Sequence, residues 1–273
     1  MPHTRRPGRW GLLALGVATV STGAVVGARG LLHRQASQAR AAIGKPLGAD
    51  ALAGDRTWRK KHGERIDLLL LGDSIAAGLG ADSPRHTPGA RIAKGLAKRS
   101  NRAVRLHTAA VVGAESSDLV GQVADLPASY RPDVAVVVIG GNDVTHRVPV
   151  AESVGHLLAA VEAVHERGAV VVVGTCPDLG ALTALPQPLR ALGSRASRQL
   201  AAAQARAVEA RGVHVVSLAR TVGPFFHAMP EEMFSLDRFH PSSLGYKRTA
   251  QALLPAVLAA LGEGRRDGEH QAS

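Results

Sequence analysis

Residues 66–78 read IDLLLLGDSIAAG, a run of leucines that ends on Gly72, Asp73 and Ser74. A continuous apolar run of this length is typical of a β-strand buried on both faces, as in a parallel sheet. Small residues follow, so the pattern predicts a tight turn from strand into helix. Its polar residues fit two roles: a helix cap made by Asp73 or Ser74, or a nucleophilic hydroxyl on Ser74. The stretch alone does not choose between them.

The same kind of apolar run recurs along the chain and indicates the fold class. Further strands are predicted at 104–112, 133–139, 169–175 and 213–218. Helices are predicted near 88–100, 116–126, 149–167, 188–211 and 243–261. Strands that alternate with helices are typical of βαβ units. We therefore expect an α/β fold, a three-layer α/β/α domain around a five-stranded parallel flavodoxin-like sheet.

The domain organisation follows from changes in composition. Residues 65–262 hold all of these elements and are expected to form one domain, followed by a polar tail at 263–273. Residues 29–64 are polar, Ala-rich and basic, which is typical of a linker. Ahead of them, Trp10–Ala28 contains 19 residues without a charge. As a helix this segment would be about 28 Å long, enough to cross a bilayer.

Residues 1–28 are accordingly predicted to be a basic flank plus a signal-anchor or transmembrane segment, forming an N-terminal hydrophobic helix. An uncleaved anchor is favoured over a cleaved signal peptide, whose apolar core is shorter, about 7–15 residues. We expect a membrane-anchored protein with its catalytic domain outside the cytoplasm, or a secreted protein if the segment is cleaved. Arginines flank the segment on both sides, so charge does not set its orientation. The sequence leaves the oligomeric state open.

Composition argues against several classes of function. The net charge is +11, but the basic residues are spread widely and no nucleic-acid-reading motif is present, so no nucleic-acid partner is expected. A local basic run at 56–65 is predicted to be solvated or to face lipid headgroups. Cys176 is the single cysteine, and neither a paired-Cys nor a His-Glu-x-x-His metal pattern occurs. No phosphate-binding glycine loop occurs either. We expect no metal and no cofactor.

Polar residues follow the predicted strands at the points where ligands bind in such sheets, beyond the carboxyl ends. Gly113 follows the second strand, where it would let the backbone approach a ligand closely. Asn142 follows the third strand within Gly140–Asp143 and is one of only two asparagines in the chain. Its side-chain amide could face a developing oxyanion. Turn chemistry alone would also explain both loops.

A third polar stretch, FSLDRFHPSSLGY at 234–246, places Asp237 three residues before His240. An aspartate beside a histidine can orient the ring and stabilise its charged form during proton transfer. A surface ion pair would have the same spacing. Together, Ser74, Gly113, Asn142, Asp237 and His240 nevertheless supply every group that nucleophilic catalysis needs: a hydroxyl, a base, a group that orients the base, and oxyanion donors.

This combination resembles the SGNH hydrolase family, also called GDSL-type esterases or lipases, over residues 65–262. The four residues that name the family match Ser74, Gly113, Asn142 and His240, and its last block, Asp-x-x-His, begins here at Asp237. The second block is matched by Gly113 alone. The resemblance implies that Ser74 attacks an acyl carbonyl, that His240 transfers the proton and that Asp237 orients His240.

The resemblance further implies that the N–H groups of Ser74 and Gly113 and the amide of Asn142 hold the oxyanion. It gives Asp73 and Asp143 the role of bracing the loops. An α/β-hydrolase would need Gly-x-Ser-x-Gly at the nucleophile, which this turn lacks.

Two further points stay open in the sequence. A membrane-tethered, non-catalytic binding module on the same fold is the alternative function, although the complete set of Ser, Asp and His argues against it. The substrate is expected to be a small-molecule, lipid or carbohydrate ester; carbohydrate acetyl esters, lysophospholipids and acyl thioesters all fit. The loop at 176–190 suits the wall of an acyl site or a plain connection equally well.

Overall fold

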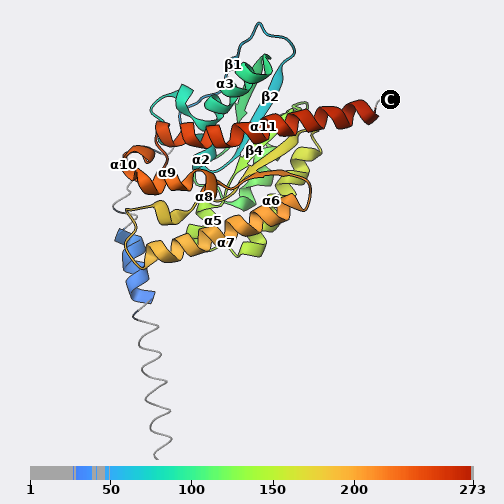
Figure 1. Cartoon of the computed structure of the whole chain (residues 1–273). Helices are drawn as coiled ribbons and strands as arrows, with labels where there is room; N and C mark the ends of the chain where they lie inside the picture. The colour runs from blue at the N-terminus through green and yellow to red at the C-terminus, as the bar shows by residue number, and fades with distance from the viewer. Residues whose placement is uncertain (1–26, 28, 39–40, 42–46, 49, 272–273) are drawn as a thin grey trace, which may run out of the picture.

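The computed structural model describes residues 27, 29–38, 41, 47–48 and 50–271 (Figure 1). The predicted signal-anchor segment at 1–28 lies outside the described residues, apart from Gly27. Among the helices of the described part, none is both long enough and apolar enough to span a membrane.

The core of the fold is one mixed sheet. In the described residues its six strands are β1 (Thr57–Trp58), β2 (Ile66–Gly72), β3 (Val104–Thr108), β4 (Val134–Val138), β5 (Val170–Gly174) and β6 (His214–Val216), in the order β1-β3-β2-β4-β5-β6. Strands β2 to β6 pair in parallel, whereas β1 pairs antiparallel with β3. Without β1, the order is the flavodoxin-like order of doubly wound sheets.

The expectation of a five-stranded, purely parallel sheet is thus corrected by one edge strand. Strand β1 is two residues long and lies inside the stretch at 29–64 that was predicted to be a linker. Thr57 pairs with Arg105, and Trp58 pairs with Val104. Two residues are too few to show the alternation of apolar and polar side chains that predicts a strand, so the sequence could not predict β1.

Helices cover both faces of the sheet, which explains the run of four leucines in β2. One face is covered by α3 (Pro88–Ser100) and α11 (Ser243–Gln271), and the other by α4 (Leu119–Ala124), α6 (Val150–His165) and α7 (Leu189–Glu209). Leu68 and Leu70 pack into the apolar cluster of the first face, and Leu69 and Leu71 into that of the second. None of the four is more than 1% exposed. Helix α11 continues through most of the tail that was expected at 263–273.

Short helices follow the carboxyl ends of the parallel strands. They are α2 (Ser74–Ala77) after β2, η2 (Ser116–Asp118) after β3, α5 (Gly141–His146) after β4, η3 (Leu179–Ala181) after β5, and α8 (Leu218–Thr221), α9 (Gly223–Ala228) and α10 (Pro230–Met233) after β6. We call these segments, with the loops beside them and the starts of the long helices, the carboxyl edge; it lies at the lower left of Figure 1. The opposite side, where segments lead into the strands, is the amino edge.

The chain before the domain is attached to the carboxyl edge. Residues 29–38 are helical, and Gln35 is 8% exposed. The Gln35 side chain donates to the carbonyl of Gln187 at 2.6 Å and accepts from the N–H of Leu189, the first residue of α7, at 3.3 Å. Part of the predicted linker is therefore packed against the start of α7 (Figure 1).

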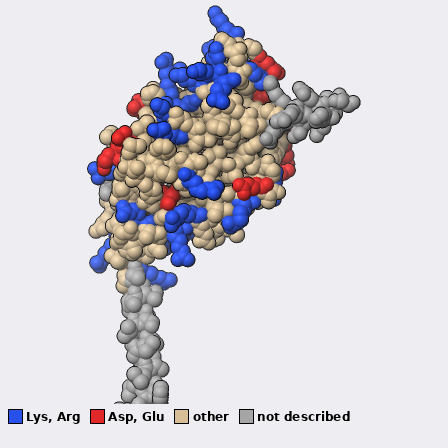
Figure 2. Space-filling view, viewed as in Figure 1, with Lys and Arg blue, Asp and Glu red and all other residues tan. Residues whose placement is uncertain are grey.

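The basic run at 56–65 lies on the other side of the molecule. It comprises β1 and the loop that leads into β2, at the amino edge. Figure 2 shows Lys and Arg side chains gathered over this loop at the top of the molecule, far from the point where the helix at 29–38 is attached.

Candidate active site

Ser74 is the first residue of α2, and the turn before it fixes its position. Gly72 has φ +135°, and a Cβ there would lie 1.9 Å from the carbonyl oxygen of Val138, so only glycine fits. Asp73 is the N-cap of α2, and its Oδ1 accepts from the N–H of Ile75 at 2.8 Å. The two interpretations of this turn are therefore compatible: the side chain of Asp73 caps the helix, and Ser74 carries its hydroxyl at the start of the helix.

A buried glutamine holds the end of the strand that carries Ser74. Gln122 accepts from the N–H of Gly72 at 2.9 Å and donates to its carbonyl at 2.8 Å. Behind α2, the hydroxyl of Tyr246 donates to the carbonyl of Leu79 at 2.6 Å. Sequence reasoning missed both residues. The one available signal was a glutamine and a tyrosine at otherwise apolar helix positions.

The fold brings Ser74 together with the distant pair Asp237 and His240. The Nε2 atom of His240 lies 2.9 Å from the Oγ atom of Ser74, which is 166 residues away in the sequence. On the other side of the ring, Nδ1 of His240 lies 2.6 Å from Oδ2 of Asp237. This is a continuous hydrogen-bonded chain from a buried carboxylate through an imidazole to a hydroxyl, the arrangement that activates a serine.

Asp237 is built to stay ionised. Its Oδ1 accepts from the N–H of Phe239 at 3.0 Å, from that of His240 at 2.9 Å and from the hydroxyl of Ser235 at 3.0 Å. Burial would raise the pKa of Asp237, but the hydrogen bonds from the His240 ring and from the two N–H groups outweigh it and lower the pKa. A carboxylate that keeps its charge holds the proton of His240 on Nδ1 and leaves Nε2 to face Ser74.

Helix α5 holds the loop that contains Gly113. Asn142 donates through Nδ2 to the carbonyl of Ala114 at 2.8 Å. The buried carboxylate of Asp143 accepts from both the N–H and the hydroxyl of Ser116. Farther along α5, Nδ1 of His146 contacts Oε1 of Glu115. Three successive residues of this loop are thus fastened to one short helix, which the sequence had suggested only as a turn.

Gly113 lies at the exposed tip of this loop with φ +88°, in open space. Within the described residues, neither the N–H of Gly113 nor that of Ser74 makes a hydrogen bond. The second N–H of the Asn142 amide is also unused there. The structure therefore leaves three donors available at the carboxyl edge that could bind an oxyanion.

Asp73 lies in an unusual environment for a carboxyl group. It is 2% exposed, and burial raises its pKa to about 6, although the N–H of Ile75 and the charge of His240 act in the opposite direction. The neighbouring carboxylate of Asp143 raises the pKa further. Asp73 has no hydrogen bond to His240 among the described residues, so it does not belong to the chain of Asp237, His240 and Ser74.

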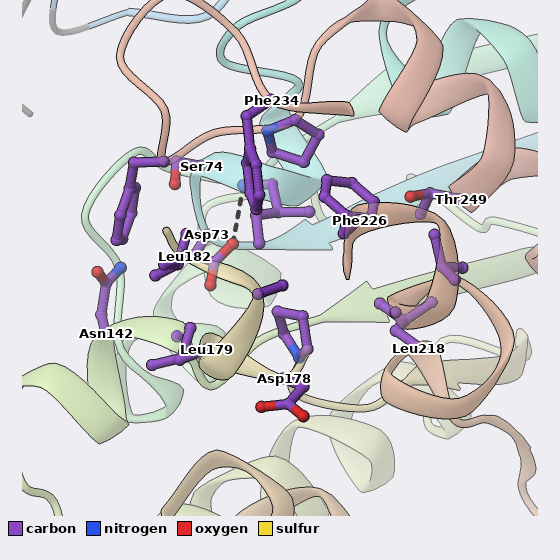
Figure 3. Close-up of a pocket in the computed structure, with 18 residues that line it drawn as sticks. Asp73, Ser74, Asn142, Asp178, Leu179, Leu182, Leu218, Phe226, Phe234 and Thr249 are labelled. Carbon is purple, nitrogen blue, oxygen red and sulfur yellow. Dashed lines mark hydrogen bonds between the residues drawn. The ribbon is translucent and has the colours of Figure 1, made fainter. Parts of the chain in front are cut away.

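An apolar pocket opens beside Ser74 (Figure 3). Its lining includes Leu179 and Leu182 near η3, and Leu218, Phe226 and Phe234 from the segments around α8 to α10. The carboxyl group of Asp73 points into it. The loop at 176–190 therefore does line the pocket, but Leu218 and Phe226 were missed, since nothing in their sequence relates them to Ser74. Across the described residues, no group of three His, Cys, Asp or Glu side chains is placed to bind a metal.

Comparisons with known proteins agree on one family. The model of the GDSL-like lipase/acylhydrolase family matches residues 70–248. Over 262 residues the chain is 44% identical to the GDSL-like esterase Rv1075c of Mycobacterium tuberculosis, covering 92% of this chain and 83% of that protein.

Solved structures share the fold at lower identity. A variant of the acetyl xylan esterase Axe2 from Geobacillus stearothermophilus is 20% identical with a TM-score of 0.55, over 72% of this chain and 95% of that one. An extracellular lipase from Streptomyces rimosus is 19% identical with a TM-score of 0.51, over 71% of this chain and 99% of that one.

Proposed function

Because the chain belongs to the GDSL-like lipase/acylhydrolase family, it is a hydrolase that acts on ester bonds, and we propose that Ser74, His240 and Asp237 catalyse the reaction. The observation that carries this proposal is the unbroken chain of hydrogen bonds from Asp237 through His240 to the hydroxyl of Ser74. Nothing in the comparisons supports the non-catalytic binding module that the sequence left open.

In the first half of the reaction, Oγ of Ser74 attacks the carbonyl carbon of the ester while Nε2 of His240 takes the hydroxyl proton. Asp237 stabilises the imidazolium that forms. The carbonyl oxygen becomes an oxyanion, and its collapse breaks the bond to the leaving oxygen. That oxygen takes the proton from His240, and an alcohol departs from an acyl-Ser74 intermediate.

In the second half, water replaces the alcohol. Nε2 of His240 takes a proton from the water as its oxygen attacks the acyl carbon. The second oxyanion collapses by breaking the bond to Ser74, and the proton on His240 returns to the serine oxygen. The products are a carboxylic acid and the regenerated hydroxyl, so the cycle needs no further reactant.

The oxyanion is assigned to the N–H groups of Ser74 and Gly113 and to the side-chain amide of Asn142. Support comes from the absence of hydrogen-bond partners for both N–H groups among the described residues. The bond from Asn142 to Ala114 fixes the amide plane, so its other N–H is oriented before the substrate arrives. Preorganised donors of this kind stabilise the transition state without reorganising during the reaction.

The acyl group is assigned to the apolar pocket beside Ser74. The pocket walls are side chains such as Leu182, Leu218 and Phe226, which suit hydrocarbon rather than sugar hydroxyls. The similar structures named above include an acetyl xylan esterase and a lipase, so they do not set the acyl length for this chain.

Three substitutions test the assignment with p-nitrophenyl acetate as the substrate: Ser74→Ala, His240→Ala and Asp237→Asn. Ser74→Ala and His240→Ala should each lower kcat by about 10⁶-fold, because the three groups act as one unit, and Asp237→Asn by about 10⁴-fold. The chain offers a matched control in the exposed pair of Asp82 and His86, whose contacting atoms are 2.5 Å apart. In the described structure the ring of His86 makes no hydrogen bond to a serine hydroxyl.

The control variant His86→Ala should keep the turnover of the unmodified chain. If Ser74→Ala and His240→Ala hydrolyse the ester as fast as the unmodified chain does, the assignment is wrong. Circular dichroism on each variant separates a loss of chemistry from a loss of fold.

A further inference from the structure

In the part of the chain that the structure describes, large apolar side chains are exposed on one side only. Within the described residues, the large apolar side chains with at least 40% exposure are Leu31, Leu52, Val111, Val120, Leu192 and Leu236. Single exposed apolar residues are ordinary on protein surfaces. Their distribution over the fold is the informative observation here.

Two of the six lie on the loops that form the candidate active site. Leu236 is 88% exposed and directly precedes Asp237, and Val111 is 54% exposed, two residues before Gly113. The N–H of Val111 donates to the carbonyl of Gly72, which places it at the end of β2. Both residues therefore lie on loops that contribute to the surroundings of Ser74.

The other four lie at the same edge of the sheet. Val120 and Leu192 are near the starts of α4 and α7, and helices that follow parallel strands begin at the carboxyl edge. Leu31 lies on the helix at 29–38, which Gln35 attaches to the start of α7. Leu52 comes three residues before Asp55, whose carboxylate accepts from the N–H of Thr108 at the end of β3.

The amino edge offers the contrast. The turns that lead into β2 to β6 expose charged side chains instead, among them Lys60, Lys61, Arg131, Glu166 and Arg211. None of the large exposed apolar residues of the described chain lies there. The amino edge is thus suited to contact with water, and the carboxyl edge to contact with an apolar partner.

The course of the chain indicates which partner this is. The uncharged stretch Trp10–Ala28 ends one residue before Arg29, and Arg29 is six residues before Gln35, the attachment point on the carboxyl edge. At about 1.5 Å per helical residue, Arg29 and Gln35 are about 9 Å apart along this helix. In the sequence, a segment with the composition of a membrane anchor therefore directly precedes the helix that is attached to the edge with the exposed leucines and valines.

We propose that the carboxyl edge packs against a lipid bilayer, so that ester substrates reach Ser74 from the lipid surface. The second half of this statement rests on the proposed function; the first does not. Exposed charges of both signs lie between the apolar side chains, including Arg34, Arg238, Glu231 and Glu232. Apolar contact rather than net charge therefore holds this edge to lipid, and high salt should weaken the contact only slightly.

Site-specific fluorescence on the full chain tests the orientation. Cys176 is fully buried, so a cysteine introduced at the surface is labelled selectively in the folded protein. We would attach an environment-sensitive NBD probe to Leu236→Cys and, as a matched control at the amino edge, to Ser129→Cys, where the native residue is exposed. Both variants would carry Ser74→Ala, so that the result does not depend on turnover.

With vesicles of phosphatidylcholine and phosphatidylglycerol, the probe at 236 should shift its emission to shorter wavelength and brighten severalfold, in low and in high salt. The probe at 129 should not change. A third variant, Leu192→Cys, should respond like Leu236→Cys and covers the case in which position 236 does not tolerate the label.

Equal responses at 236 and 129, or no response at 236 and 192, would overturn the proposal. So would a shift at 236 that depends on protein concentration without vesicles, because it would identify a second copy of the chain as the partner. Since these proteins lack Ser74, failure here leaves the proposed hydrolysis standing, and failure of the triad variants leaves the lipid contact standing.

Discussion

Two buried aspartates, one at each edge of the sheet, have similar burial but different partners. At the amino edge, Asp67 is held by two arginines, with Nε of Arg65 at 3.1 Å and Nε of Arg105 at 2.6 Å. At the carboxyl edge, Asp237 is held by backbone N–H groups and by His240. A guanidinium keeps its protons at any physiological pH, whereas an imidazole can gain or lose one.

The difference in partner separates structural from chemical roles. The pairs of Asp67 can fix the start of β2 against β3, but no proton can pass through them. Asp237 is instead paired with His240, whose ring can exchange a proton and contacts the hydroxyl of Ser74. The account therefore predicts that substitutions at the carboxyl edge change turnover most, and that substitutions at the amino edge change stability without changing turnover.

The two asparagines of the chain allow the sharpest test of this contrast, because one lies at each edge. Replacing Asn142 with alanine removes a donor from the proposed oxyanion site and should lower kcat by about 10²–10³-fold. Steady-state kinetics with a p-nitrophenyl ester measures this effect.

Asn101 is the matched control at the amino edge. It ends α3 with φ +53°, a conformation that asparagine tolerates better than alanine. Asn101→Ala should therefore lower the free energy of unfolding by about 1 kcal/mol and leave kcat unchanged. A larger loss of kcat in Asn101→Ala than in Asn142→Ala would break the contrast between the edges.

Asp73 should produce a pH-dependent effect on stability. Its pKa rises from 3.8 to about 6 on folding, mainly through burial, so the native state holds this proton more tightly than the unfolded state does. Stability is then unaffected below about pH 4 and falls as the pH rises to about 6, by about 3 kcal/mol in total. Asp73→Asn keeps a good N-cap and removes the buried charge.

Urea unfolding would measure this effect at two pH values. Asp73→Asn should be more stable than the unmodified chain at pH 8 by up to about 3 kcal/mol, and no more stable at pH 4. If Asp73→Asn is instead less stable than the unmodified chain at pH 8, the ionised carboxylate of Asp73 stabilises the folded state by more than its burial costs.

Asp67→Asn should have little effect on activity. The substitution weakens four hydrogen bonds from Arg65 and Arg105 and leaves both cations partly unpaired, which should lower the free energy of unfolding by about 1–3 kcal/mol. Turnover at a temperature where the variant stays folded should remain within about twofold of the unmodified chain, which is about 0.4 kcal/mol. A larger loss of turnover would mean that the amino edge also shapes the site.

Much of the fold could be predicted because its main strands are continuous apolar runs in the sequence. The strand at Ile66–Gly72 and the helix at Pro88–Ser100 begin and end where the sequence indicates, since the leucine run is buried on both faces and Pro88 opens the helix. The predicted strand at 104–112 is shorter in the structure, ending at Thr108, because the chain turns at Val111 to form the loop around Gly113.

The site was harder to predict: the sequence indicated its polar catalytic residues but not the apolar residues that line the pocket. Asp237 and His240 carry a recognisable spacing, whereas Gln122 and Phe226 look like ordinary helix residues until the fold brings them to Ser74. Apolar lining residues have no sequence signature because any core residue has the same composition. Tertiary packing alone distinguishes them.

The most direct test of the central claim is covalent labelling of the full chain with a fluorophosphonate, followed by intact-mass measurement and peptide mapping. If Ser74 is the nucleophile activated by His240, one adduct should form per chain, on the peptide that contains Ser74, and ester turnover should be lost in parallel. His240→Ala should react far more slowly. An adduct on any other residue, or a labelled protein that still hydrolyses esters, would contradict the account.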